Sequence, residues 1–186
     1  MRLYCYTYHA EKILQEGYLS VAANPNPKQL EMYARKAGST DFEDIKKYLE
    51  KTLPGRTRSI SCLTEKAPIE DYEHPYLDYL VHNAAVISFE LDDLLKDGLV
   101  EMIYCKDNSQ TAKADIDFEN VFEIKNPAEI DTSPLNWHQC SEAYGSPYNM
   151  LRHYILILSK GFIPPEYLRL SATISLLSLS VVPLIV

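Results

Sequence analysis

Apolar and polar residues along the chain follow two different periods, which predict strands and helices respectively. Segments 3–7 and 85–91 alternate between apolar and polar residues, as in a strand with one buried face. Segment 154–158 is apolar throughout, which predicts a strand buried on both faces. Further strand-like patterns occupy 59–63, 99–105, 121–124 and 167–170, the last of which is expected to return to the sheet.

Helical spacing is concentrated near the start of the chain. The predicted helices and the residues that end them are 10–16 with Gly17, 29–37 with Gly38, and 42–53 with Pro54 and Gly55. The last two of these helices are expected to form an amphipathic insertion. Ser39 or Thr40 is the expected cap of the third helix, with Glu43 at the capping-box distance from Thr40. Shorter helical segments are expected at 92–96 and 148–153.

The order of these elements predicts the fold class. Helices come early and strands follow, which is typical of an α+β fold with a mixed or antiparallel sheet. Residues 1–170 are expected to form a single domain. Segment 170–186 is uncharged, and its length is close to the minimum of about 17 residues for a membrane span. Because serines, a threonine and a proline interrupt it, we expect 171–186 to be a terminal strand or a disordered tail, with no contact to a membrane unless through 170–186.

Composition narrows the classes of function. The 186 residues carry 18 Lys and Arg against 26 Asp and Glu, and this net charge of −8 argues against general binding of duplex nucleic acid. The 14 tyrosines suggest a tyrosine-lined pocket. No cleavable secretory signal begins the chain, so a cytoplasmic location is predicted and export by another route stays open. The cysteines Cys5, Cys62, Cys105 and Cys140 are far apart, which predicts structural thiols and no metal site.

Common enzyme motifs are absent from the chain, which has no P-loop, GxGxxG, HExxH or GxSxG. Five pieces nevertheless follow one another in order: LYCYT at 3–7, ILQEG at 13–17, RSISCLTE at 58–65, VISFEL at 86–91 and FENVFEI at 118–124. This order resembles the ADP-ribosyltransferase-like fold, particularly its bacterial toxin-type members. The likeness covers residues 3–125 and implies a split sheet with an early helical insertion.

The resemblance implies an enzyme that uses NAD⁺ as a substrate, needs no metal, and transfers ADP-ribose to an acceptor. Cleavage of the nicotinamide–ribose bond passes through an oxocarbenium-like state, which a carboxylate bonded to the ribose stabilises. Glu119 is the candidate for this carboxylate by position, with Glu123 second, and Ser61 is a further catalytic candidate. The acceptor stays open between protein, nucleic acid, small molecule and water.

The resemblance also implies residues that bind NAD⁺. These are Arg56 or Arg58 for the pyrophosphate, Ser59 and Ser61 for the ribose or for bracing the first strand, and Tyr4, Tyr6 or Tyr8 for stacking on the nicotinamide. Cys5 stands where the toxin-type relatives have a histidine in the first strand, so the imidazole contact would have to come from His9. Glu119 also lacks the Glu-x-Glu neighbour of arginine-directed members.

Two other hypotheses compete with the transferase. The first is a non-catalytic binding module on the same fold, which would recognise a protein partner through its tyrosines and acidic surface; the cluster 136–139, which holds the single Trp, would rim a cleft or contact such a partner. The second is a cysteine nucleophile activated by an imidazole. Its candidate thiols are Cys62 and Cys140, and its candidate bases are His74, His82, His138 and His153.

Overall fold

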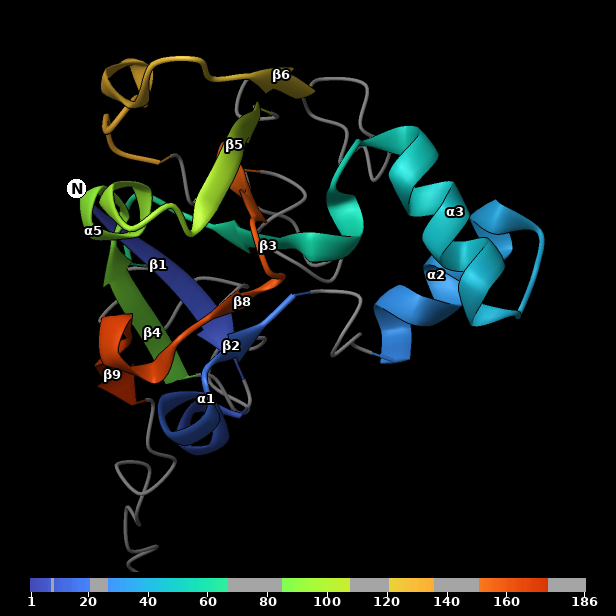
Figure 1. Ribbon diagram of the computed structural model, residues 1–186, viewed down its shortest axis with the longest axis horizontal. Coiled ribbons are helices and arrows are strands. Elements are labelled where there is room, and N and C mark those ends of the chain that lie inside the picture. The colour runs from blue at the N-terminus through green and yellow to red at the C-terminus, as the bar shows by residue number, and fades with distance from the viewer. Residues whose placement is uncertain (8, 21–26, 67–84, 108–120, 136–150, 174–186) are drawn as a thin grey trace, which may run out of the picture.

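The computed structural model describes residues 1–7, 9–20, 27–66, 85–107, 121–135 and 151–173 (Figure 1). Within these residues the strands are β1 (Arg2–Thr7), β2 (Tyr18–Leu19), β3 (Ser59–Cys62), β4 (Ala85–Glu90), β5 (Val100–Lys106), β6 (Val121–Glu123), β7 (His153–Leu158), β8 (Phe162–Ile163) and β9 (Arg169–Thr173). The helices are α1 (Ala10–Glu16), α2 (Pro27–Ala37), α3 (Phe42–Thr52) and α5 (Leu91–Lys96), with 3₁₀ turns η1 (Arg56–Arg58), η2 (Pro127–Glu129) and η6 (Pro165–Tyr167). The chain is therefore of the α+β class, as its pattern predicts.

Two antiparallel sheets form the body of the molecule. The first sheet has the strand order β1-β4-β9, and the second sheet has the order β3-β7-β5-β6. A separate pair is formed by β2 and β8. Several partners are remote in sequence, because β4 lies beside β1 and β7 lies between β3 and β5. Each sheet is thus assembled from both early and late parts of the chain.

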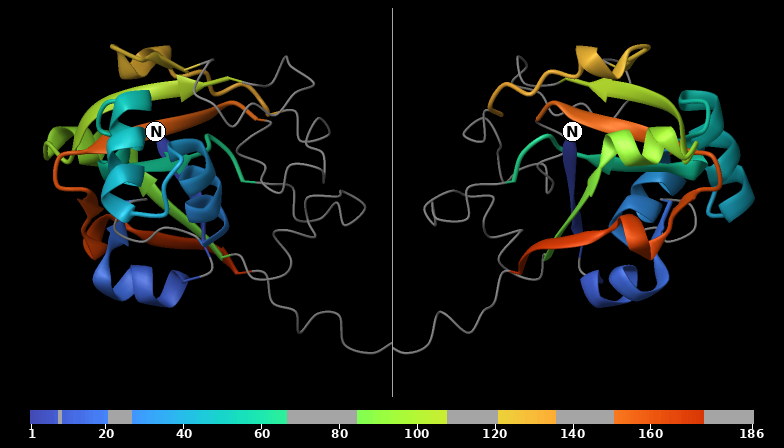
Figure 2. Two further views of the ribbon diagram at one scale, coloured as in Figure 1. Left: turned by 90° about the vertical axis from the view of Figure 1, so that its right-hand side faces the viewer. Right: turned by 60° about the vertical axis from the view of Figure 1, so that its left-hand side comes forward.

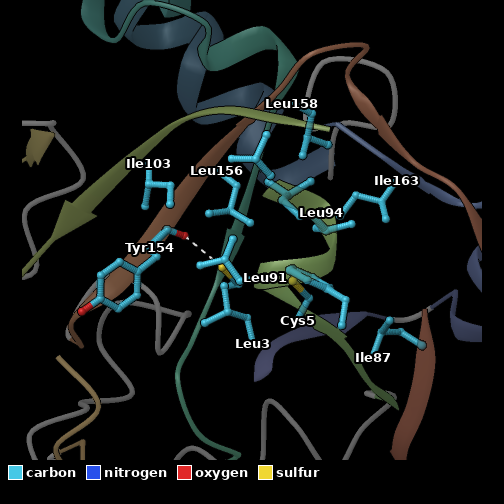
Figure 3. Close-up of a cluster of buried hydrophobic side chains, with 14 of the residues drawn as sticks. Leu3, Cys5, Ile87, Leu91, Leu94, Ile103, Tyr154, Leu156, Leu158 and Ile163 are labelled. Carbon is cyan, nitrogen blue, oxygen red and sulfur yellow. Dashed lines mark hydrogen bonds between the residues drawn. The ribbon is translucent and has the colours of Figure 1, made fainter. Parts of the chain in front are cut away.

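One large hydrophobic core joins the two sheets (Figure 3). Its buried residues include Leu3 and Cys5 from β1, Ile87 from β4, and Tyr154 and Leu156 from β7. All six residues of β7 are buried, which confirms the strand predicted to be covered on both faces. Its alternate residues, among them Ile155, pack on the opposite face of the second sheet, in a smaller cluster with Leu53 and Tyr104.

Helices α2 and α3 lie together at one side of the molecule (Figures 1 and 2). They enclose a small cluster of their own, formed by the buried residues Tyr33, Ile45 and Leu49. Leu53 follows α3 directly and packs against Ile155 and Ile157 of β7, so the end of α3 rests on the second sheet. The helix pair is therefore a separate layer beside the sheets, and its last turn leads into η1 and β3.

The expected capping box of α3 is wrong. The N-cap is Asp41, whose Oδ1 accepts hydrogen bonds from the backbone N–H groups of Glu43 at 2.8 Å and Asp44 at 3.3 Å. Ser39 supports this arrangement, because its Oγ accepts from the Asp41 N–H at 3.1 Å. A carboxylate at the cap also interacts more favourably with the helix dipole than the hydroxyl of Thr40 would.

Near the end of the chain, the structure differs from two predictions made from the sequence. The helix expected at 148–153 is wrong at its described end, because residues 151 and 152 are not helical and β7 begins at His153; residues 148–150 lie outside the described part. The last strand, β9, runs to Thr173, three residues into the predicted tail, and the rest of that tail also lies outside. None of the helices in the described part is long and apolar enough to cross a membrane.

Candidate functional site

The two sheets meet at a short junction between their edge strands. Tyr4 of β1 and Leu63, the residue after β3, form an antiparallel bridge with two backbone hydrogen bonds, both 2.9 Å long. Tyr6 and Ser61 lie two residues further along the two strands, where Cys5 Sγ donates to the Ser61 carbonyl at 3.2 Å. The edge strand of one sheet thus touches the edge strand of the other near the middle of β1.

Five residues around this bridge lie on one side of it, and we call them the junction face: Tyr4, Tyr6, Ser59, Ser61 and Leu63. Their alternate neighbours, Leu3 and Cys5 on β1 and Ile60 and Cys62 on β3, belong to the core between the sheets. Because side chains alternate along a strand, the junction face lies on the other side of both strands. Four of the residues predicted to contact NAD⁺ are therefore brought together by the fold.

Arg56 is buried at the start of this face, one turn before β3. Its Nη1 donates to Ser59 Oγ at 2.5 Å, and its Nη2 donates to the Tyr33 hydroxyl of α2 at 3.3 Å. Ser59 Oγ in turn donates to the Arg56 carbonyl at 2.8 Å. The guanidinium is therefore held in a fixed orientation by β3 and by the helical layer. The contact with Tyr33 could not be expected from the sequence, because 22 residues separate the two.

Arg58 serves a different part of the structure. Its Nη1 donates to the carbonyls of Leu158 at 3.0 Å and Ser159 at 3.1 Å and forms an ion pair with Glu101 at 3.0 Å. These contacts lie where β7 ends, at the opposite end of β3 from Leu63. Of the two arginines predicted as alternatives for a pyrophosphate, Arg56 is the one that hydrogen-bonds a residue of the junction face, Ser59, whereas the contacts of Arg58 are with β5 and the end of β7.

Two buried basic residues, Lys106 and His153, lie on the same face of the second sheet as Ser61. They pair directly across β5 and β7, and the register of β3 continues to place Leu63 beside His153. His153 Nδ1–H donates to the Leu151 carbonyl at 3.3 Å. Burial, followed by the positive charges of Lys106 and Arg56, lowers the pKa of His153 to about 3, so the imidazole is neutral at pH 7. Lys106 was missed because the apolar pattern of its strand ends at Cys105.

The geometry does not support a dyad of Cys62 and His153. Cys62 Sγ donates to the Tyr154 carbonyl at 3.5 Å on the core side of the second sheet, whereas His153 lies on the other side with Ile155. Burial also raises the pKa of the Cys62 thiol well above its usual value, which disfavours the nucleophilic thiolate. The other residues of that hypothesis, Cys140, His74, His82 and His138, lie outside the described part, as does the cluster 136–139.

The remaining residues predicted to take part in catalysis or NAD⁺ binding are not members of the junction face. Glu123 is exposed on β6, aligned with Tyr104 and Ile155 across the sheet, and three strand spacings of about 4.8 Å place it about 14 Å from Ser61. The structure therefore does not bring Glu123 to the junction face. His9 is exposed at the start of α1, where its backbone N–H donates to Thr7 Oγ1 at 3.1 Å. Glu119 and Tyr8 lie outside the described residues.

Comparisons with protein-family models, with curated proteins and with solved structures gave no match. No group of three or more potential metal-ligating side chains is found among the residues that the structure describes.

Proposed function

We propose that this chain is an NAD-dependent ADP-ribosyltransferase whose nicotinamide and its ribose bind at the junction face. The observation that carries the proposal is the convergence of Tyr4 and Tyr6 with Ser59 and Ser61 on one side of two touching edge strands. Two small antiparallel sheets that meet at a single bridge are also compatible with the split sheet that the sequence resemblance implies. No metal takes part in the proposed reaction.

The side chains of the junction face have properties that suit the two halves of such a ligand. Tyr4 and Tyr6 are half-buried, so each offers an aromatic surface for stacking on the nicotinamide ring. Ser61 is half-buried on the same face, and its hydroxyl is able to both donate to and accept from a ribose hydroxyl. The fixed guanidinium of Arg56 supplies positive charge at the end of the face, which favours an adjacent pyrophosphate.

The proposed reaction needs a carboxylate, and Glu119 is our candidate. In the reaction the nicotinamide leaves with the electron pair of the bond to the ribose, positive charge develops on the ribose, and an acceptor group attacks and loses its proton. A carboxylate held against the ribose stabilises that charge in the transition state more than in the ground state. Glu119 lies two residues before the start of β6 in the sequence.

Mass-spectrometric detection of free nicotinamide after incubation of the protein with NAD⁺ tests the proposal. We expect release by the unaltered protein, loss of release in Glu119→Gln, and a reduced rate in Ser61→Ala. Glu123→Gln is the matched control, because Glu123 is exposed on β6 and about 14 Å from Ser61. Full activity of Glu119→Gln would exclude Glu119 from the catalytic role.

A non-catalytic binding module is the second candidate, and one observation favours it. Cys5, which stands where the toxin-type relatives have a histidine, is fully buried on the core side of β1, so this position contributes no imidazole and faces away from the junction face. Under this hypothesis the tyrosines recognise a protein partner. Absence of both nicotinamide release and NAD⁺ binding, the latter measured by calorimetry, would support the binding module over the transferase, whereas NAD⁺ binding without release would point to a missing acceptor.

A further inference from the structure

Two cysteines face each other where the two sheets meet. The bridge between Tyr4 and Leu63 is closed by both of its backbone hydrogen bonds, and Cys5 and Cys62 are the residues next to it on the two strands. Both side chains are fully buried and both belong to the core cluster, so they lie on the same side of the strands. These thiols are distant in sequence and adjacent in the fold.

The geometry of this position is compatible with a disulfide. Where two antiparallel strands stay paired, residues next to a hydrogen-bonded pair have Cα atoms about 4.5 Å apart, and disulfides span about 4.4 to 6.8 Å. The Cys5 thiol is already directed at β3, because its Sγ donates to the Ser61 carbonyl at 3.2 Å. The Cys62 thiol donates to the Tyr154 carbonyl at 3.5 Å, and rotation about its Cα–Cβ bond releases only this weak hydrogen bond.

We propose that Cys5 and Cys62 form a cross-strand disulfide under oxidising conditions, which covalently joins the first sheet to the second. The proposal is independent of the transferase hypothesis, because it depends only on the register of β1 and β3. The bond would reinforce the place where a single backbone bridge now connects the two edge strands.

The reduced pair is protected while the protein is folded. Burial, and then the neighbouring Cys5 thiol, raise the pKa of the Cys62 thiol well above its usual value, so little thiolate forms there. Both side chains are also inaccessible to an oxidant in solution. We therefore expect the bond to form during folding, or after β1 has separated from β3, and only slowly in the folded reduced protein.

The oxidant is a low-molecular-weight disulfide, such as oxidised glutathione. One cysteine thiolate attacks a sulfur of oxidised glutathione, which forms a mixed disulfide and releases one glutathione thiolate. The second cysteine thiolate then attacks the protein sulfur of that mixed disulfide and releases the second glutathione thiolate. Two protein thiols are oxidised, one glutathione disulfide is reduced, and the two thiol protons pass through water to the glutathione thiolates.

Refolding in glutathione buffers tests the proposal. The reduced, unfolded chain is refolded at several ratios of oxidised to reduced glutathione, free thiols are alkylated, and tryptic peptides are analysed by mass spectrometry. Cleavage after Arg2, Lys12, Arg58 and Lys66 places Cys5 in peptide 3–12 and Cys62 in peptide 59–66. We expect these two peptides to be linked, and the oxidised protein to unfold about 10 °C higher than the reduced protein.

Two variants make the result specific. Cys5→Ala should abolish the linked peptide and the difference in unfolding temperature between oxidised and reduced samples, whereas Cys105→Ala, which alters a buried thiol outside the pair, should preserve both. The proposal is overturned if the chain regains its native circular dichroism spectrum in the most oxidising buffer with Cys5 and Cys62 still alkylated. It is also overturned if linkage occurs mainly to another cysteine, or if the linked protein does not regain that spectrum.

Discussion

Gly55 and Gly98 both have left-handed backbone conformations, but their surroundings differ. Gly55 has φ +81°, and a Cβ atom there would lie 2.5 Å from Cγ2 of Ile157. Gly98 has φ +67°, and a Cβ atom there would meet nothing within 4 Å. The absence of a side chain at Gly55 is thus what allows the turn after α3 to approach β7 closely.

This difference predicts unequal effects of adding one methyl group. We expect Gly98→Ala to lower the free energy of unfolding by about 1 kcal/mol, from the left-handed conformation alone. Gly55→Ala should lower it by roughly 3 kcal/mol, because either β7 or η1 must shift to accommodate the methyl group. Urea denaturation followed by circular dichroism measures both values. Equal losses would show that the contact with Ile157 is easily relieved.

His153 predicts how stability depends on pH. The unfolded pKa of histidine is about 6.5, and in the fold burial and the charges of Lys106 and Arg56 lower the pKa of His153 to about 3, against the opposing effect of the Leu151 carbonyl and Asp107. Between these two values the unfolded chain binds a proton that the folded chain does not. Stability from this group is therefore complete above pH 6.5 and is lost as the pH falls toward 3.

From pH 7 to pH 5 we expect His153 to account for a loss of about 2 kcal/mol in the free energy of unfolding. His153→Asn is the comparison, because the Asn amide can replace the Nδ1–H that donates to the Leu151 carbonyl. The difference in stability between pH 7 and pH 5, measured by urea denaturation, should be smaller in this variant. An identical pH dependence in both proteins would contradict a buried neutral imidazole.

At the scale of elements, α3 depends on its first turn as well as on its packing. Its apolar face contacts α2 through Ile45 and Leu49, and Asp41 satisfies two N–H groups at its start. We expect Asp41→Ala to lower the free energy of unfolding by about 1 kcal/mol, because both N–H groups lose their acceptor. Thermal unfolding by circular dichroism would detect the change.

Thr40→Ala is the matched control for this prediction. Thr40 immediately precedes Asp41 and is exposed, so its removal should leave the unfolding temperature unchanged. A larger effect at Thr40 than at Asp41 would restore the capping box expected from the sequence and contradict the observed hydrogen bonds.

On the scale of the whole molecule, the two sheets share one core. Leu3 of the first sheet and Leu156 of the second are both fully buried in it. We therefore predict that the sheets unfold together, and that Leu3→Ala and Leu156→Ala each cost about 3 kcal/mol in one cooperative transition. Urea denaturation followed in parallel by far-UV and near-UV circular dichroism checks this. Two separated transitions in either variant would mean that the sheets are independent units.

Local patterns predicted most of the individual elements. The helix at 10–16, the strand starting at Ala85 and the doubly buried strand at 154–158 depend on residues close in sequence, and their periods are visible without knowledge of neighbours. The cap of α3 was misassigned because Ser39, Thr40 and Asp41 are all good caps and only the backbone geometry distinguishes them.

The candidate site was predictable only in part. The pieces LYCYT and RSIS indicated Tyr4, Tyr6, Ser59 and Ser61, but nothing in the spacing indicates that Arg56 turns toward Tyr33 while Arg58 turns toward β7. The position of Glu119 relative to the junction face stays a prediction. The direction in which each arginine side chain turns depends on hydrogen-bond partners from distant segments of the chain, which local sequence patterns do not reveal.

The α+β class, the early helices and the strand patterns follow from the amino-acid sequence, because these depend on hydrophobic periodicity and turn residues within a few positions. Which edge strands touch, and hence that Tyr4 pairs with Leu63 while Cys5 and Cys62 lie next to this bridge, depends on the tertiary structure. The reason is physical. Strand register and sheet order are fixed by burial of a shared core, and that free energy belongs to residues separated by much of the chain.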